Sequence, residues 1–179
     1  MDSAEIIGDR RLAELYRYWD GCRRGRGMPA RPDLDPVDIP RLLSILILVD
    51  VKGDGDYRFR LIGTELVTVA RRDITGLRFE EAFPPGPYLN YLFALYAELI
   101  RERRPIYTEG IYVIGSPGRR RYTRRLILPL SADGRRIDMV LGAHVHELMS
   151  DPERAALHDR KDPYIETVRR TLAPAPASA

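Results

Sequence analysis

The first part of the chain has the polar and apolar pattern of an amphipathic helix. Between Asp9 and Arg24 the apolar residues recur at the three- and four-residue spacing of one helix face: Leu12, Leu15, Tyr16, Trp19 and Cys22. Asp9 is suited to cap the start, and Gly25 or Gly27 to end the helix. Because so short a helix is marginal alone, we expect its stripe to pack on a sheet or on a partner chain.

The next segment is rich in proline and aspartate. Asp35-Pro36-Val37-Asp38 has the residue order of an N-cap and first turn, with Asp38 near the positive end of the helix dipole. A calcium loop starting at Asp33 would need glycine at its sixth position and glutamate at its twelfth, where the chain has Asp38 and Ser44. We therefore predict a capped hinge and no metal.

Five later segments have strand patterns, which are residues 45–51, 57–63, 106–115, 122–130 and 137–147. The first two are joined by the glycine turn 52–56 and predict a hairpin. In its second strand Tyr57, Phe59 and Leu61 alternate with two arginines, so we expect these three on the buried face. The last strand predicts Leu141 on one face, with His144 and His146 on the other.

Helical patterns separate the second and third strands. Short pieces over residues 64–83, with Thr64 as a cap, precede a long helix that ends before Pro105. One face of this helix carries Tyr88, Tyr91, Leu92, Leu95, Tyr96 and Leu99. After residue 150 we predict a polar helical stretch to 172 and a disordered Ala/Pro tail. The pattern divides the chain into 1–27 (helix and cap), 28–148 (sheet domain) and 149–179 (C-terminal extension).

Composition places the chain among globular proteins of a reducing compartment. Its 179 residues suit one domain with extensions, and a single cysteine excludes an internal disulfide framework. No secretory pattern or membrane-length apolar run is present, so we expect a cytoplasmic protein without a membrane partner. A net charge of +3 is too small to indicate nucleic acid by itself.

Several motifs together resemble a family of short, stand-alone bacterial PAS-domain proteins. They are Tyr18-Trp19, Met28-Pro29-x-Arg31, Asp33-x-Asp35-Pro36-x-Asp38-Ile39, Leu42-Leu43, Val49-Asp50-Val51, Phe59-Arg60-Leu61-x-Gly63-Thr64 and Asp73-x-Thr75-Gly76. The resemblance covers about residues 10–148 and implies an α+β fold. The fold would have a five-stranded antiparallel sheet of order 2-1-5-4-3, with helices over a pocket on one face.

The resemblance also implies a non-catalytic sensory or docking module. With no kinase, cyclase or DNA-binding domain following, we expect it to signal in trans to an unidentified signalling protein. PAS domains often dimerise through the helix before the first strand, so we expect a homodimer with Leu12, Leu15, Tyr16 and Trp19 at the interface. The only cysteine, Cys22, lies upstream of the short helices, and residues 88–104 hold no histidine, so neither flavin nor haem is expected.

Two interpretations of the pocket stay open. Its candidate lining is Tyr57, Phe59, Leu61, Tyr91, Leu95, Tyr112, Leu128 and Leu141, which could receive a small apolar or amphipathic ligand. Alternatively, these side chains fill the core, as in many small domains. Tyrosine favours a pocket slightly, because buried hydroxyl groups need partners.

Two further groups of residues have an alternative reading. His144 and His146 share a strand face, but Glu147 points to the other, so we expect no metal and place the histidines under the N-terminal helix or at the surface. A nucleophilic pair of Cys22 with His144 lacks an orienting group. The basic segment 119–125 supports the main alternative function, which is a nucleic-acid-binding protein. The same segment could instead face an acidic protein partner.

Overall fold

The computed structural model describes residues 3–113, 120–149 and 164–173. An antiparallel sheet forms its centre, with six strands in the order β2-β1-β5-β4-β3-β6. The strands are β1 (Leu46–Gly53), β2 (Asp56–Ile62), β3 (Ile106–Val113), β4 (Arg120–Leu130), β5 (Met139–Leu148) and β6 (Tyr164–Thr171). The predicted α+β class and the order 2-1-5-4-3 are confirmed, and β6 extends the sheet beyond the five strands expected.

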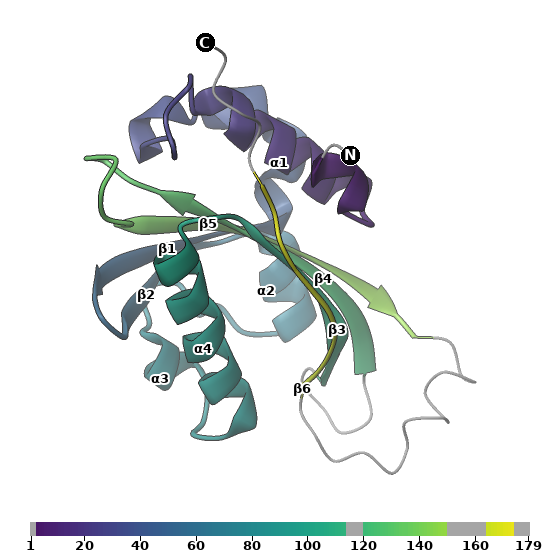
Figure 1. The fold of residues 1–179 in the computed structure, drawn as a ribbon. Helices are drawn as coiled ribbons and strands as arrows, with labels where there is room; N and C mark the ends of the chain where they lie inside the picture. Colours follow the sequence, from purple (N-terminus) through teal and green to yellow (C-terminus); the bar gives the residue numbers. More distant parts are fainter. Residues whose placement is uncertain (1–2, 114–119, 150–163, 174–179) are drawn as a thin grey trace.

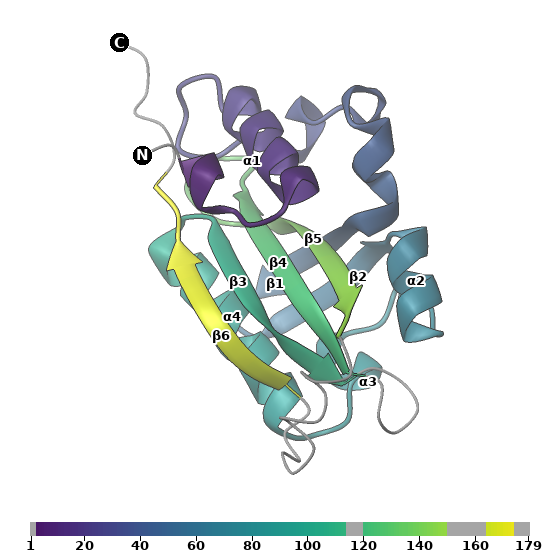
Figure 2. The ribbon, with the colours of Figure 1, turned by 90° about the vertical axis from the view of Figure 1, so that its right-hand side faces the viewer.

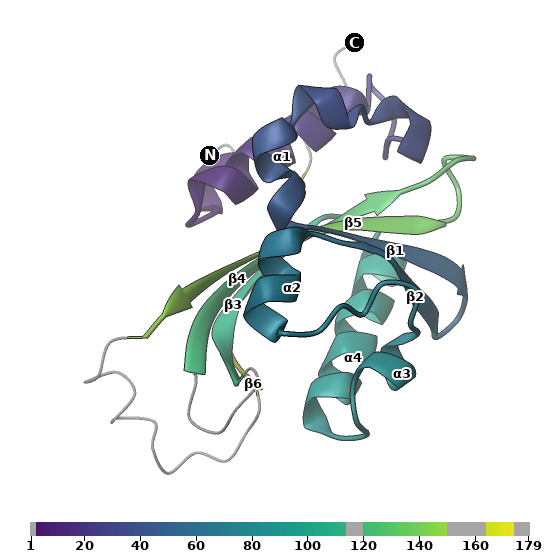
Figure 3. The same ribbon diagram turned by 180° about the vertical axis from the view of Figure 1, so that it is seen from behind.

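Helices cover both faces of the sheet (Figure 1). They are α1 (Arg10–Cys22), α2 (Thr64–Ala70), α3 (Phe79–Ala82) and α4 (Pro87–Glu102), and 3-10 turns span Ser3–Ile6, Arg31–Asp33, Pro36–Asp38 and Pro40–Ile45. We call the face under α1 the outer face and the face toward α2, α3 and α4 the inner face. Figure 3 shows these three helices together on the inner side. No helix in the described part of the chain is long and apolar enough to cross a membrane.

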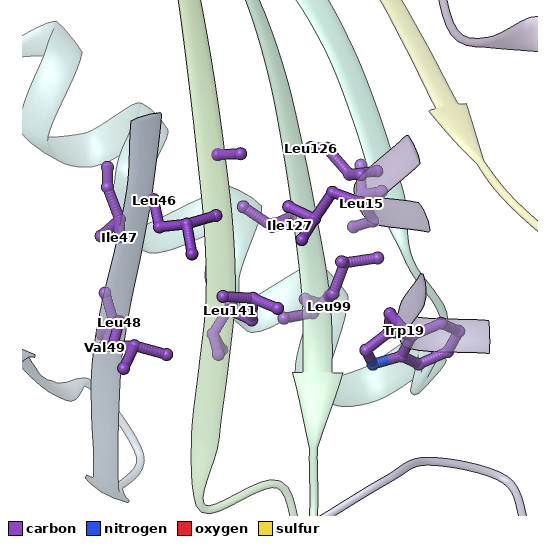
Figure 4. Packing of buried hydrophobic residues seen from close by; sticks show 14 of the residues in the cluster. Leu15, Trp19, Leu46, Ile47, Leu48, Val49, Leu99, Leu126, Ile127 and Leu141 are labelled. Carbon is purple, nitrogen blue, oxygen red and sulfur yellow. The ribbon is translucent and has the colours of Figure 1, made fainter. Parts of the chain in front are cut away.

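Helix α1 forms as predicted and packs on the outer face. The Asp9 carboxylate accepts from the backbone N–H groups of Arg11 and Leu12 at 2.8 and 3.1 Å, which caps its start. Trp19 is fully buried, and its Nε1 donates to the carbonyl oxygen of Pro129 in β4 at 2.9 Å. Figure 4 shows Leu15 and Trp19 of α1 with core residues of the sheet.

The hinge between α1 and β1 also forms as predicted. The Asp35 carboxylate accepts from the backbone N–H of Val37 at 2.9 Å, at the start of the turn Pro36–Asp38. The predicted cap at Thr64 is wrong by one residue, because α2 begins at Thr64 and Gly63 is its N-cap. A Cβ on Gly63 would lie 2.2 Å from the backbone oxygen of Ser44, so only glycine fits there.

An irregularity in the β1–β2 pairing changes the predicted face of Leu61. Leu48 pairs with Leu61 but Val49 pairs with Phe59, so Arg60 is an extra residue in β2. Tyr57 and Phe59 are buried on the inner face as expected, whereas Leu61 turns to the outer face and is 41% exposed. The simple alternation therefore fails for Leu61.

The predicted C-terminal helix is replaced by a strand where the structure describes it. Residues 164–171 form β6, which pairs with β3, and residues 151–163 of that prediction lie outside the described residues, as does the tail beyond 173. Figure 2 shows β6 along the edge of β3. The backbone N–H of Leu172 donates to the carbonyl of Pro105 at 2.8 Å, and Tyr16 donates to the carbonyl of Ala173 at 3.0 Å. The C-terminal strand is therefore fixed to β3 and α1.

Candidate functional site

A cavity of about 210 Å³ lies between the inner face of the sheet and helices α2, α3 and α4. Most of its lining is apolar or aromatic: Ile47, Phe59, Ile62, Leu66, Val69, Ala70, Ile74, Phe79, Ala82, Phe83, Tyr88, Leu92, Tyr96 and Tyr112. Four lining residues carry nitrogen groups, which are Arg72, Arg125, His144 and His146. An apolar wall with a few polar groups is typical of small-molecule sites.

A layer of aromatic rings forms one wall of the cavity. The Phe79 ring lies 4.8 Å from that of Phe59 and 4.9 Å from that of Tyr96, measured between centroids. Tyr57 packs behind them, 5.1 Å from Phe79. Tilted and edge-on contacts of this kind stabilise the packing of the wall.

Arg125 of β4 is the main polar group of the site and is 1% exposed. Its Nε donates to Nε2 of His144 on β5 at 3.0 Å, and its Nη2 donates to the Tyr88 hydroxyl on α4 at 3.1 Å. The guanidinium also lies over the rings of Tyr91 and Tyr164, at 5.6 and 5.5 Å from their centroids. Strands β4, β5 and β6 and helix α4 thus meet at one cation.

The two histidines beside Arg125 are neutral. Burial, then the charge of Arg125, holds the pKa of His144 well below its ordinary value. The same causes lower the pKa of His146 to about 3, and its Nδ1 lies 2.9 Å from the Thr123 hydroxyl. Of these three neighbouring groups, Arg125 therefore carries the charge, while both imidazoles stay uncharged near neutral pH.

The tyrosines around the cavity keep their protons for the same reason. Burial raises the pKa of Tyr88, Tyr91, Tyr96 and Tyr112, although the nearby charge of Arg125 opposes the shift. They therefore provide hydroxyl donors and acceptors rather than negative charge.

Helix α4 and strand β6 are joined next to this cluster. Arg169 of β6 pairs with Glu98 of α4, and its Nε donates to Glu166 Oε1 at 2.8 Å. The Tyr91 hydroxyl donates to Glu166 Oε2 at 2.8 Å, and the Tyr91 ring lies 4.3 Å from that of Tyr164. Through Tyr91 and Tyr164, β6 is packed directly against the surroundings of Arg125.

The predicted pocket residues divide into three groups. Phe59 and Tyr112 line the cavity. Tyr57, Tyr91 and Leu95 lie beside it, in the aromatic layer, near Arg125 and in the core respectively. Leu61, Leu128 and Leu141 are on the outer face. Leu141 pairs with both Leu48 and Leu128, so these side chains share one face of the sheet. Leu61 and Leu141 line a different groove on that outer face. Those three are wrong as lining of an inner pocket.

The predicted interface residues are also placed differently. Leu12, Leu15, Tyr16 and Trp19 are between 0 and 2% exposed, packed within their own chain. They therefore offer no surface to a second chain, and the helix stripe is satisfied by the sheet instead.

The two faces of the sheet also place the histidines and Cys22, the other candidates of the sequence analysis. The histidines line the inner cavity, so their expected position under the N-terminal helix is wrong. Cys22 is on α1 at the outer face, away from His144, and burial raises the pKa of its thiol. Within the described ranges no three His, Cys, Asp or Glu side chains are grouped as a metal site would need.

The basic segment 119–125 does not form one continuous surface. Arg125 is buried in the core, and Arg124 on the opposite face pairs with Glu147 at 2.6 Å. The Tyr122 hydroxyl donates to Glu109, so this ring is engaged within the sheet. Arg119 lies outside the described residues. A nucleic-acid site on this segment would therefore have to form without Arg125, because its side chain is buried.

Sequence reasoning missed Arg125, Tyr88 and Tyr164 as site residues. A signal for Arg125 was present, since it is two residues from Ile127 and alternation puts both on one face. An arginine at the end of a segment with four other arginines is, however, ordinarily a surface residue. Tyr164 was missed because the sequence analysis predicted a helix, not a strand, for its segment.

The sheet order, the helices over its inner face and the cavity between them are the architecture of an α+β domain of the PAS class. Comparison with family models gives a match to the PAS domain over residues 8–145, and the chain belongs to this family. Members are sensory and regulatory modules that are typically non-catalytic. The match crosses the predicted boundary at residue 27, which stays a prediction. A search of curated proteins gave no significant match.

Solved structures of low sequence identity are similar to the chain. The PAS domain of BvgS from Bordetella pertussis has 15% identity and a TM-score of 0.49, covering 69% of this chain and 90% of that one. The LOV domain of the blue-light activated histidine kinase EL346 from Erythrobacter litoralis has 15% identity and a TM-score of 0.45, covering 61% and 100%.

Proposed function

We propose that this chain is a non-catalytic PAS sensory module of the cytoplasm that binds a small apolar or amphipathic ligand. Its site is the inner cavity, and it acts in trans through contact with a partner protein. The observation that supports the proposal is the cavity of about 210 Å³ with an apolar wall and buried polar groups. This volume is below the range of roughly 300–1,000 Å³ that is usual for ligand sites, which points to a small molecule.

The energetics of the core support a bound ligand. Side chains that border unfilled space lose the dispersion contacts that a packed neighbour would supply. A ligand that fits between Phe83, Leu92 and Tyr112 would restore those contacts and bury its own apolar surface. Binding to the folded state alone would raise the apparent stability by mass action.

The junction of α4 and β6 is the proposed route to the partner. Tyr88 lines the cavity and its ring lies 5.9 Å from that of Tyr164 on β6, between centroids. A ligand that moves Tyr88 would alter the packing of Tyr164, and thus the edge of the sheet that a partner can contact.

A tryptophan that fills the cavity tests the ligand site. Val69 lines the cavity from α2, whereas Val37 is 81% exposed on another turn. We expect native mass spectrometry of protein from its own host to show a small molecule on wild type and on Val37→Trp, and little on Val69→Trp. Equal occupancy of both variants, or an empty wild type that no member of an apolar ligand screen stabilises, would overturn the proposal.

Homodimer formation stays part of the proposal, with an interface other than the buried stripe of α1. Light scattering across a concentration series tests it. A mass of two chains that is unchanged by tenfold dilution would support the dimer, and a single-chain mass at high concentration would contradict it.

A further inference from the structure

The cavity contains a buried cation with an unused donor. Nε and Nη2 of Arg125 are hydrogen-bonded, but its Nη1 is buried and has no hydrogen-bond partner among the described residues. A buried donor on a charged group that lacks an acceptor costs roughly 1–3 kcal/mol or more. Such a group, on a residue that lines the cavity, favours a ligand that brings an acceptor.

The charge of Arg125 is also without a carboxylate. In the ranges that the structure describes, the ion pairs of neighbouring arginines join Arg124 to Glu147 and Arg169 to Glu98 and Glu166, and Arg125 has none. Glu166, on the nearby strand, is held by Tyr91 and Arg169. Tyrosine rings offset the charge only in part, because cation–π contacts are weaker than a desolvated ion pair.

The rest of the lining has no negative charge. The cavity wall includes no aspartate or glutamate within the described part of the chain, and its second cation, Arg72, is exposed. Arg72 is engaged with the carbonyl oxygens of Ala82 and Glu81. An anion would therefore meet attraction from Arg125 and no repulsion from the wall.

We propose that the cavity binds a small organic monocarboxylate, with its carboxylate on Nη1 of Arg125 and its apolar body against Phe83 and Leu92. The inference rests on the proposed function and names the ligand class. One charged end suits the single buried cation, and an apolar body suits the remaining wall. The cavity volume corresponds to roughly seven water molecules, which suits benzoate or hexanoate in size.

Matched charged and neutral probes test the assignment. Calorimetric titration of wild type with benzoate and hexanoate should show binding at least tenfold tighter than with benzamide and hexanol. In Arg125→Met this preference should disappear, with the carboxylates weakened at least tenfold and the neutral probes retained. Arg124→Met, a change in the neighbouring arginine on the other face, should behave as wild type.

The outcomes separate the inference from the function on which it rests. Equal affinity of wild type for the charged and neutral probes would overturn the proposal of a carboxylate ligand, but not the proposal that the cavity binds a ligand. Inorganic phosphate binding as tightly as benzoate would overturn the monocarboxylate in favour of a general anion site. Binding of no probe, charged or neutral, would overturn both proposals. If Arg125→Met fails to fold, the probe comparison on wild type decides, together with the NMR shift of the Arg125 Nη groups on adding benzoate.

Discussion

Arg125 donates from its Nε to Nε2 of His144 at 3.0 Å, across the paired strands β4 and β5. Because a guanidinium is only a donor, Nε2 of His144 accepts and its proton is on Nδ1. The pair thus fixes both the tautomer of the histidine and the direction of the guanidinium. It also means that a second proton on His144 would face a positive charge and break the bond.

This arrangement predicts a loss of stability in mild acid. In the unfolded chain His144 and His146 take up protons near pH 6.5, whereas in the folded chain burial and Arg125 keep their pKa values far lower, at about 3 for His146. Unfolding therefore takes up protons below pH 6.5, and the stability present above that pH is lost as the pH falls toward 3. Between pH 7.5 and 5.5 we expect a loss of about 1.4 kcal/mol per histidine in urea unfolding.

The variant His146→Phe isolates one histidine. It removes one titrating group, so about half of the loss between pH 7.5 and 5.5 should remain. The absolute stability of the variant differs for other reasons, since the Thr123 hydroxyl loses its partner, and only the slope is compared. An unchanged slope would show that His146 is protonated equally in both states.

The position of α1 predicts that its apolar stripe stabilises the monomer. Leu15→Ala should lower the free energy of unfolding by about 2–5 kcal/mol and Trp19→Ala by about 3–5 kcal/mol, because both side chains are fully buried. Leu43→Ala is the control, since Leu43 is 40% exposed and should cost under about 1 kcal/mol. Small losses for Leu15→Ala and Trp19→Ala, with a change of oligomeric state, would instead place the stripe in an interface between chains.

Much of the fold was predictable because local signals agreed with the final packing. The cap at Asp9, the turn at Asp35 and the five strand patterns each correspond to an observed element. The stripe of α1 was predicted as a helix face, but periodicity shows that a face is buried and not what covers it. A helix that packs on the sheet of its own chain and a helix that packs on a second chain have the same apolar stripe.

The parts of the site that were missed depend on contacts between distant segments. The extra residue Arg60 is fixed by the pairing of β2 with β1, so alternation alone misplaces Leu61. Residues 164–171 are rich in polar side chains, and they form a strand because β3 offers an open edge. Arg125 is buried because Tyr88, Tyr91 and Tyr164 come together around it, which local sequence does not indicate.

Two glycines should respond oppositely to alanine. Gly63 is N-cap of α2, and an added Cβ would lie 2.2 Å from the Ser44 oxygen, so Gly63→Ala should cost about 2–3 kcal/mol or more as backbone must move. Gly21 is within α1 with no atom near its Cβ position, so Gly21→Ala should stabilise by about 0.5–1 kcal/mol. Thermal and urea unfolding measure both. A neutral Gly63→Ala would show that the approach to Ser44 is loose.

The last prediction concerns the attachment of β6 to α4. Arg169 pairs with Glu98 on α4 and with Glu166 on its own strand, all three being partly buried. Arg169→Met keeps the apolar stem and removes both pairs, and we expect β6 to open more readily by about 1–2 kcal/mol. Amide hydrogen exchange along β6 should then be about tenfold faster, while β5 in the sheet interior keeps its rates. Arg170→Met is the matched control, because Arg170 is exposed and pairs with Tyr107 on the outer face. If both variants exchange alike, the ion pairs do not hold β6, and its packing through Tyr91 and Tyr164 alone connects it to the cavity.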